Sequence, residues 1–236
     1  MSRLVTATDP IAVRPGLANS EGPAPAVPVL GVIQRPSSRT KPAVEVVTDL
    51  STQQVLSLYD LYLAAFAPLM TKAAARQVLN LSEFEAEMTD PRVVKCVAWA
   101  PDGQPIGLTT VTNDLESVPW ISPEFYAARF PEHAARGAIY YLGFTLVHPK
   151  YRRSSVLANM MSAMLAPVVA NRGVVGYDIC EHNNTVLRFS TNIERLFRSL
   201  SDIATSTVDT QTYYAMEFSG AGPVGTGSAA DRKASS

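Results

Sequence analysis

The chain has 236 residues, 47% of them hydrophobic, and a formal net charge of −1 at pH 7. A nearly neutral chain lacks the positive field that attracts nucleic acid or an anionic membrane, so we expect neither as a partner. Its apolar runs fall short of the roughly 18 residues that a membrane helix needs, and its N-terminus lacks the apolar stretch of a secretory signal. These features predict a cytoplasmic protein with a substantial hydrophobic core.

Composition divides the chain into three parts. Residues 1–41 are rich in proline and alanine without amphipathic periodicity, and residues 219–236 are rich in glycine, serine and alanine. Such segments bury too little apolar surface to fold, so we expect two disordered tails. One folded domain is predicted over residues 42–218.

The first part of this domain is predicted to hold a strand and several helices. Val44–Val47 is a candidate strand. Ser51 and Ser82 each stand three residues before a Gln or Glu, the spacing of a helix capping box. Pro68 interrupts the first of these helices, and a further helical segment is expected over Thr71–Leu79.

A hairpin and a long insert come next. Val93–Ala100 and Ile106–Val111 are predicted strands, and Pro101–Gln104 between them has the composition of a tight turn. The insert Thr112–Gly137 is rich in aromatic residues. It has two interpretations, a lid or binding loop, or a short helix over Pro123–Phe130 packed on the sheet.

The middle of the domain has the strongest pattern. An apolar, aromatic run at Ala138–Val147 predicts a central strand. A basic turn, His148–Ser155, and a helix over Val156–Asn171 follow it. The free backbone amides and positive dipole at the start of such a helix favour a phosphate group. A second strand is expected at Gly173–Cys180.

The last elements are a predicted helix over Thr185–Leu200 and a final strand over Thr207–Phe218, with a short partner strand near Ile203–Thr205. The whole order resembles the GNAT-type N-acyltransferases. The resemblance rests on Leu146–Arg153, which is similar to the family's V-x-P-x-Y-R motif, and on the helix start that follows it. It implies a single α/β (α+β) domain with a mixed, mostly antiparallel central sheet flanked by helices.

The resemblance also implies a co-substrate, acetyl-CoA or a longer acyl-CoA, and no metal. The arginines Arg152 and Arg153 and the backbone of the helix start would bind its pyrophosphate, and the central strand would pair with its pantetheine arm. The family's Asn after the next strand corresponds to Asn183 or Asn184. The cofactor-binding residues implied in this way are Leu146, Val147, Arg152, Arg153, Ser154, Ser155, Val156, Asn183 and Asn184.

The chain departs from the family's pattern in three places. Ser155 and Leu157 stand where the family's loop has small residues that let backbone approach phosphate. Leu157 would either crowd the cofactor or point into the core. The third departure is the family's frequent Tyr general acid, whose position falls on Ser190 or Thr191.

Proton transfer has several candidates. Adjacent tyrosines on a strand face opposite sides, so one should face the core and the other the substrate. An acid or imidazole near the cleft would take a proton from an attacking ammonium. The candidates are Tyr140, Tyr141, His133 and Glu181, with Glu132 and His182 as their neighbours. The histidines are too scattered for a metal site, and Cys180 lies in an apolar run that does not suit a nucleophile.

These patterns favour transfer of an acyl group from acyl-CoA to the amine of a small molecule, by direct attack. Two alternatives stay open, a non-catalytic ligand- or partner-binding module of the same fold, and an acyltransferase whose donor is an acyl carrier protein. A continuous sheet with no divergence between the two central strands would instead indicate an unrelated binding domain. A homodimer is also allowed.

Overall fold

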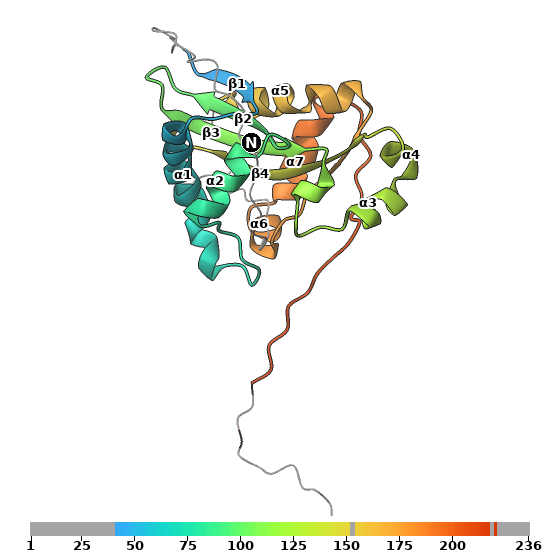
Figure 1. Cartoon of the computed structure of the whole chain (residues 1–236). Helices are drawn as coiled ribbons and strands as arrows, with labels where there is room; N and C mark the ends of the chain where they lie inside the picture. Colours follow the sequence, from blue (N-terminus) through green and yellow to red (C-terminus); the bar gives the residue numbers. More distant parts are fainter. Residues whose placement is uncertain (1–40, 152–153, 218–219, 221–236) are drawn as a thin grey trace, which may run out of the picture. The chain divides into compact units, whose positions relative to one another are not determined.

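The computed structural model describes residues 41–151, 154–217 and 220 (Figure 1). The two predicted tails, 1–41 and 219–236, therefore lie outside the described residues except at Lys41 and Gly220. Among the described residues, those from Lys41 to Thr205 belong to one compact unit and those from Ser206 onward to another. The elements below all lie in the first unit.

Five strands form one sheet in the order β1-β2-β3-β4-β5. The first four pair antiparallel and β4 pairs parallel with β5, which confirms the predicted mixed, mostly antiparallel sheet flanked by helices. Its strands are β1 (Ala43–Val47), β2 (Val94–Trp99), β3 (Pro105–Thr112), β4 (Ile139–Val147) and β5 (Val174–Gly176). The β2–β3 hairpin turns at Gly103, whose φ of 84° suits glycine.

Two helices cover one face of the sheet. The helix α1 (Thr52–Phe66) begins at the predicted capping box of Ser51. The predicted interruption at Pro68 is confirmed, because α1 passes there into the 3-10 turn η1 (Ala67–Thr71). The helix α2 (Leu81–Thr89) is capped by Asn80, with Glu83 completing the capping box.

Two predictions for this region were wrong. No helix forms over 72–80, where the chain instead wraps around the Tyr62 hydroxyl. The capping box of α2 lies two residues before the predicted one at Ser82. An Asn side chain caps a helix at least as well as Ser, and the Asn80 carbonyl oxygen accepts the Glu83 N–H at 3.0 Å.

A cluster of stacked aromatic rings joins α1 and α2 to the sheet. The Tyr62 ring lies 4.5 Å from Phe66, 5.0 Å from Phe84 and 5.2 Å from Phe144 of β4, measured between centroids. All four side chains are fully buried. Burial of this much aromatic surface, with additional ring–ring attraction, fixes α2 against the centre of β4.

The other face of the sheet is covered by α5 (Val156–Ala170) and α7 (Phe189–Arg198), with the short α6 (Glu181–Thr185) before α7 (Figure 1). Leu157 and Met161 of α5 pack with Leu142 of β4 and Phe189 of α7. The helix predicted over Thr185–Leu200 is therefore shorter than expected, because it forms only as α7, and α6 precedes it. Arg188 separates them, with a φ of 50° that an α-helix does not accommodate.

The insert forms η2 (Leu115–Ser117), α3 (Pro123–Arg129) and α4 (Pro131–Ala134). The predicted helix over Pro123–Phe130 is confirmed, and the lid interpretation stays a prediction. A further turn, η3 (Pro149–Tyr151), follows β4.

The strand predicted over Thr207–Phe218, with its partner near Ile203–Thr205, was wrong for the residues described. Residues 203–217 contain no strand. A strand requires a neighbour with which to exchange backbone hydrogen bonds, and no described residue pairs with this segment.

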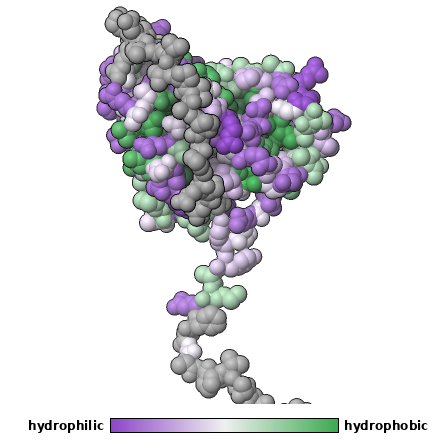
Figure 2. Space-filling view, in the orientation of Figure 1, coloured by the Kyte–Doolittle hydropathy of each residue, from purple (hydrophilic) through white to green (hydrophobic). Residues whose placement is uncertain are grey.

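Hydrophilic and hydrophobic residues are interspersed over the visible face outside the grey atoms (Figure 2). Within the described ranges, no helix combines the length and the apolar character that a membrane crossing requires.

The Tyr62 hydroxyl offers a test of how the 72–80 segment is held. It accepts the Leu79 N–H at 3.0 Å and donates to the Gln77 carbonyl at 3.3 Å. Tyr62→Phe should lower the free energy of unfolding by about 1–3 kcal/mol, because a buried N–H loses its acceptor. The half-buried Tyr59, which donates to the Leu79 carbonyl, is the matched control. Equal losses for Tyr62→Phe and Tyr59→Phe in urea titrations would contradict this account.

Candidate active site

The strands β4 and β5 separate after a short parallel pairing. Their register joins Ile139 to Val174, Tyr140 to Val175 and Tyr141 to Gly176, and it ends there. The strand β4 continues for six more residues to Val147, bonded to β3 on one side. On its other side, no described residue continues the sheet, so the predicted divergence between the two central strands is present.

The chain beyond β5 runs on without pairing to β4. Tyr177 and Ile179 pack into the hydrophobic core between the sheet and the helices α5 and α7, here called the α5–α7 core. Cys180 instead packs into the core between the sheet and the helices α1 and α2, the α1–α2 core. The side chains thus alternate as in an extended strand. No backbone hydrogen bond links residues 177–180 to β4 within the described part of the chain. The predicted strand Gly173–Cys180 is therefore correct only at Val174–Gly176.

A bulge in β4 lies where this divergence begins. Thr109 pairs with Thr145 and Val111 pairs with Leu142, so β4 contains one extra residue opposite Thr110. The Phe144 N–H donates to the Thr110 hydroxyl at 3.2 Å instead of to a β3 carbonyl. A Cβ at Gly143 would lie 2.3 Å from the Thr110 Oγ1, so only glycine allows this close approach.

The carboxylate of Glu87, on α2, faces the same bulge. Its Oε1 accepts the Thr110 hydroxyl at 3.2 Å. Removal from water raises the pKa of Glu87 to about 7, although the bond from Thr110 and the charge of Lys95 oppose the rise. Asp90, at the end of α2, raises it further. A carboxyl poised near neutral pH can both accept and release protons.

Lys95 is a cation whose charge lowers the pKa of Glu87. It is fully buried on β2, and its ammonium donates to the backbone carbonyls of Thr48 at 2.9 Å and Asp90 at 2.6 Å. Burial lowers the pKa of Lys95 to about 8. Its hydrogen bonds go to carbonyls at the ends of β1 and α2, which indicates a structural role.

A second acid lies beyond the end of β5. The Asp178 Oδ1 accepts the Tyr141 hydroxyl at 2.6 Å and the Trp120 indole N–H at 3.2 Å. Burial, followed by the charge of Asp178, raises the pKa of Tyr141 well above its usual range. Tyr126 of α3 packs edge-on against Tyr141, with ring centroids 6.0 Å apart. A carboxylate bordered by aromatic rings is suited to a cationic group.

The two predicted tyrosines face opposite sides of β4, as expected. Tyr141 lies on the face that carries Asp178. Tyr140 packs on the other face, where its hydroxyl accepts the Asn171 amide at 3.2 Å near the end of α5. The structure thus joins Tyr140 to the structural core behind the sheet and Tyr141 to the second acid.

The predicted residues of α4 and α6, for proton transfer and for cofactor binding, lie on other elements than the bulge. His133 lies on α4, with its ring edge-on to Phe130 at 6.3 Å. Glu181 is exposed at the start of α6. Asn183 is buried in α6, and the half-buried Asn184 accepts the Ser190 hydroxyl at 2.6 Å. The role of each stays a prediction.

The basic turn leads into α5 as expected. Arg152 and Arg153 lie outside the described residues. The Ser154 hydroxyl accepts the Val156 N–H at 3.3 Å, and Ser155 precedes the first turn of the helix. Leu157 points into the α5–α7 core, so it does not project from the turn. Leu146 and Val147, at the end of β4, pair with Leu108 and Gly107 of β3.

The sequence analysis missed Glu87 and Asp178. Three other acidic residues lie on or next to the same helix as Glu87. The sequence does not show which of these acids contacts the sheet, because this depends on how α2 packs. The sequence did contain one signal for Asp178, a single acid inside the apolar run at Gly173–Cys180.

The two cysteines are not suited to nucleophilic catalysis. Burial raises the pKa of Cys96 to about 12 and also raises that of Cys180, which makes both thiols poor nucleophiles. The described residues include no group of three or more metal-binding side chains.

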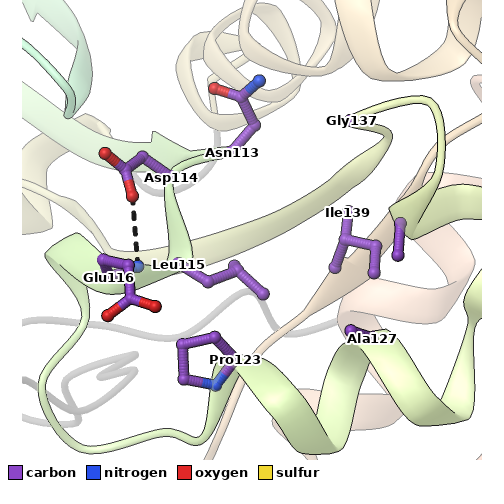
Figure 3. Close-up of a pocket in the computed structure, with 9 residues that line it drawn as sticks. Asn113, Asp114, Leu115, Glu116, Pro123, Ala127, Gly137 and Ile139 are labelled. Carbon is purple, nitrogen blue, oxygen red and sulfur yellow. Dashed lines mark hydrogen bonds between the residues drawn. The ribbon is translucent and has the colours of Figure 1, made fainter.

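A cavity of about 230 Å3 lies near the beginning of β4, between the insert and the end of β3 (Figure 3). Of its two lining acids, Asp114 is already engaged, by the Glu116 N–H at 3.2 Å and by Arg92 at 3.7 Å. We assign it no role. The lining residues are Asn113, Asp114, Leu115, Glu116, Pro123, Ala127, Ala134, Gly137 and Ile139.

No protein-family model and no curated protein matches the chain. Among solved structures, it is similar to an aminoglycoside 6'-N-acetyltransferase from Acinetobacter baumannii, with 12% identity and a TM-score of 0.43 over 75% of this chain and 99% of that one. A ribosomal-protein-alanine N-acetyltransferase from Brucella melitensis biovar Abortus gives 13% identity and a TM-score of 0.42, again over 75% and 99%. A third similar structure is an aminoglycoside N-acetyltransferase in complex with CoA. It has 14% identity and a TM-score of 0.44, over 78% of this chain and 100% of that one.

The raised pKa of Glu87 makes a prediction about stability. The folded state favours the protonated carboxyl. The contribution of Glu87 to the free energy of unfolding is therefore fully present below pH 4.5 and is lost as the pH rises through about 7. Glu87→Gln abolishes this loss. Relative to wild type, the variant should gain roughly 1–3 kcal/mol of unfolding free energy between pH 5 and pH 8.

Urea titrations at the two pH values measure this difference. Glu85→Gln, on the same helix and without a side-chain hydrogen bond to β3, should show no comparable gain. A pH-independent difference for Glu87→Gln would contradict the raised pKa.

Proposed function

We propose that the protein is an acyl-CoA-dependent N-acyltransferase, which moves an acetyl or longer acyl group to the amine of a small molecule. The observation that carries the proposal is the divergence of β4 from β5 after Tyr141. It leaves a strand edge next to a bulge, with a titratable acid on the neighbouring helix. The sequence resemblance to GNAT-type enzymes points in the same direction.

The chemistry of the donor fits such an edge. The pantetheine arm of CoA is an extended chain with two amide groups, and a free strand edge binds extended amides as it would bind another strand. In Leu142–Val147, the backbone groups that point away from β3 have no strand partner among the described residues, whereas the others face β3. An arm that lies there would place its thioester near the bulge at Gly143.

The pyrophosphate would then reach the turn between β4 and α5. The first backbone amides of α5 and the positive end of its dipole favour an anion. Arg152 and Arg153 would add two charge-assisted bonds. Leu157 is no obstacle, since its side chain is buried with Leu142 and Met161.

The acceptor would be an amine that arrives as an ammonium ion. The Asp178 carboxylate provides negative charge on the face of β4 toward the insert, and the half-buried Trp120 that donates to it adds aromatic surface. Tyr126 and Tyr141 are buried beside them. This combination suits a small cationic molecule with apolar parts better than a long polyanion. Two alternatives must be distinguished from this function by experiment. One is an acyltransferase whose donor is an acyl carrier protein, and the other is a binding module of the same fold without turnover.

Calorimetric titration with acetyl-CoA and with octanoyl-CoA tests the donor site. We expect wild type to bind at least one of them with a micromolar dissociation constant, on the order of −8 kcal/mol. The variant Arg152→Ala/Arg153→Ala should weaken this binding about tenfold or more, because two charged partners of the pyrophosphate are lost.

The control is Lys72→Ala/Arg129→Ala, which removes the same charge from exposed positions on η1's end and on α3. It should leave binding unchanged. If neither thioester binds wild type, the acyl-CoA proposal is wrong, and capture of an acyl carrier protein becomes the next test.

A further inference from the structure

The acid Glu87 is held at the one place where β4 is irregular. Its helix α2 is fixed by the aromatic cluster of Tyr62, Phe84 and Phe144. The Thr110 hydroxyl links it to the bulge, since Thr110 accepts the Phe144 N–H and donates to the Glu87 Oε1, both at 3.2 Å. The carboxylate therefore has a defined position relative to the β4 backbone.

Glycine at position 143 brings the acid close to that backbone. A Cβ built at Gly143 would lie 3.3 Å from the Glu87 Oε1, which is within contact distance. A larger residue would collide with Thr110 and displace the acid. The carboxylate thus lies against β4 one residue after Leu142, where the edge away from β3 becomes open.

The second acid lies on the same face of β4. Tyr141, which donates to Asp178, precedes Gly143 by two residues, a separation of about 7 Å along a strand. An acceptor ammonium beside Glu87 would thus lie on the face of β4 where Asp178 adds a second negative charge. Asp178 would attract the cation, and Glu87 would receive its proton.

We propose that Glu87 is the general base that deprotonates the acceptor ammonium, a role that rests on the acyl transfer proposed above. In the reaction, the ammonium gives one proton to the Glu87 carboxylate, and the freed lone pair forms a C–N bond to the thioester carbonyl carbon. The C–S bond then breaks with its electron pair on sulfur. The second nitrogen proton passes to that sulfur, which gives the amide and free CoA thiol, and Glu87 later releases its proton to water.

The titrating surroundings of Glu87 agree with this role. Lys95 on β2 favours its ionised form, Asp90 on α2 opposes it, and the Tyr62 phenol on α1 stays neutral because burial raises its pKa above the usual range. Thr110 on β3 is the neutral donor. A base that titrates near pH 7 matches the working range of most enzymes.

The test measures thiol release from acetyl-CoA with tyramine, tryptamine and spermidine, using the amine that wild type acylates fastest. Wild-type kcat should rise with pH through an apparent pKa near 7. Glu87→Gln should lower kcat at pH 7 by about 10²–10⁴-fold and remove this inflection. Its deficit should shrink about tenfold or more toward pH 9.5, because a growing share of the amine is then neutral.

Two controls separate catalysis from structure. Glu85→Gln should keep the wild-type profile, and calorimetry should give Glu87→Gln the wild-type affinity for acetyl-CoA. Suppose that wild type acylates an amine, and that Glu87→Gln keeps the wild-type kcat within about threefold and the inflection of kcat near pH 7. The general-base role of Glu87 is then wrong, whereas the proposed acyl transfer still stands. If wild type binds acyl-CoA but acylates none of the amines, the proposed function and the general base fall together.

Discussion

The parallel pairing of β4 with β5 over only three residues is the constraint on which the rest of the candidate site depends. A sheet that continued past Tyr141 would satisfy the backbone of Leu142–Val147 with another strand. Because the pairing stops, the backbone groups of this segment that point away from β3 have no strand partner among the described residues, as the binding of an extended ligand would require. The next segment, 177–180, keeps the alternation of a strand, but Tyr177, Ile179 and Cys180 pack into the two cores. Side-chain packing thus holds the two central strands apart.

The aromatic cluster between the sheet and the helices α1 and α2 positions Glu87 next to the open edge of β4. Four buried rings on α1, α2 and β4 lock α2 in place, and Glu87 occurs one turn after Phe84 on the same helix. The bulge then brings Phe144 and Gly143 to the same side, so that ring packing and the Thr110 hydroxyl position the carboxylate together. Stability and reactivity at this point depend on the same contacts.

The fold could be predicted from the sequence where local chemistry determines it. The capping box of Ser51, the turn at Gly103 and the apolar run of β4 each imply their element without reference to the rest of the chain. The strand over 207–218 could not be predicted correctly, because a strand depends on a partner elsewhere. The short pairing of β5 likewise results from tertiary packing.

The candidate site shows the same division. The opposite orientations of Tyr140 and Tyr141 follow from the period of a strand and were predictable. Glu87 was not, since its importance comes from a bulge 56 residues later in the sequence that its own helix does not reveal. The bulge itself leaves no mark in the sequence beyond a single glycine in an apolar run.

Hydrogen–deuterium exchange with and without acetyl-CoA tests the central claim, that the open edge of β4 holds the donor. Peptides that cover Leu142–Val147 and the start of α5 should exchange more slowly when acetyl-CoA is bound, because their amides gain partners in the ligand. Protection confined to the cavity near Asn113 and Ile139, or unchanged exchange along β4 at saturating acetyl-CoA, would contradict the claim.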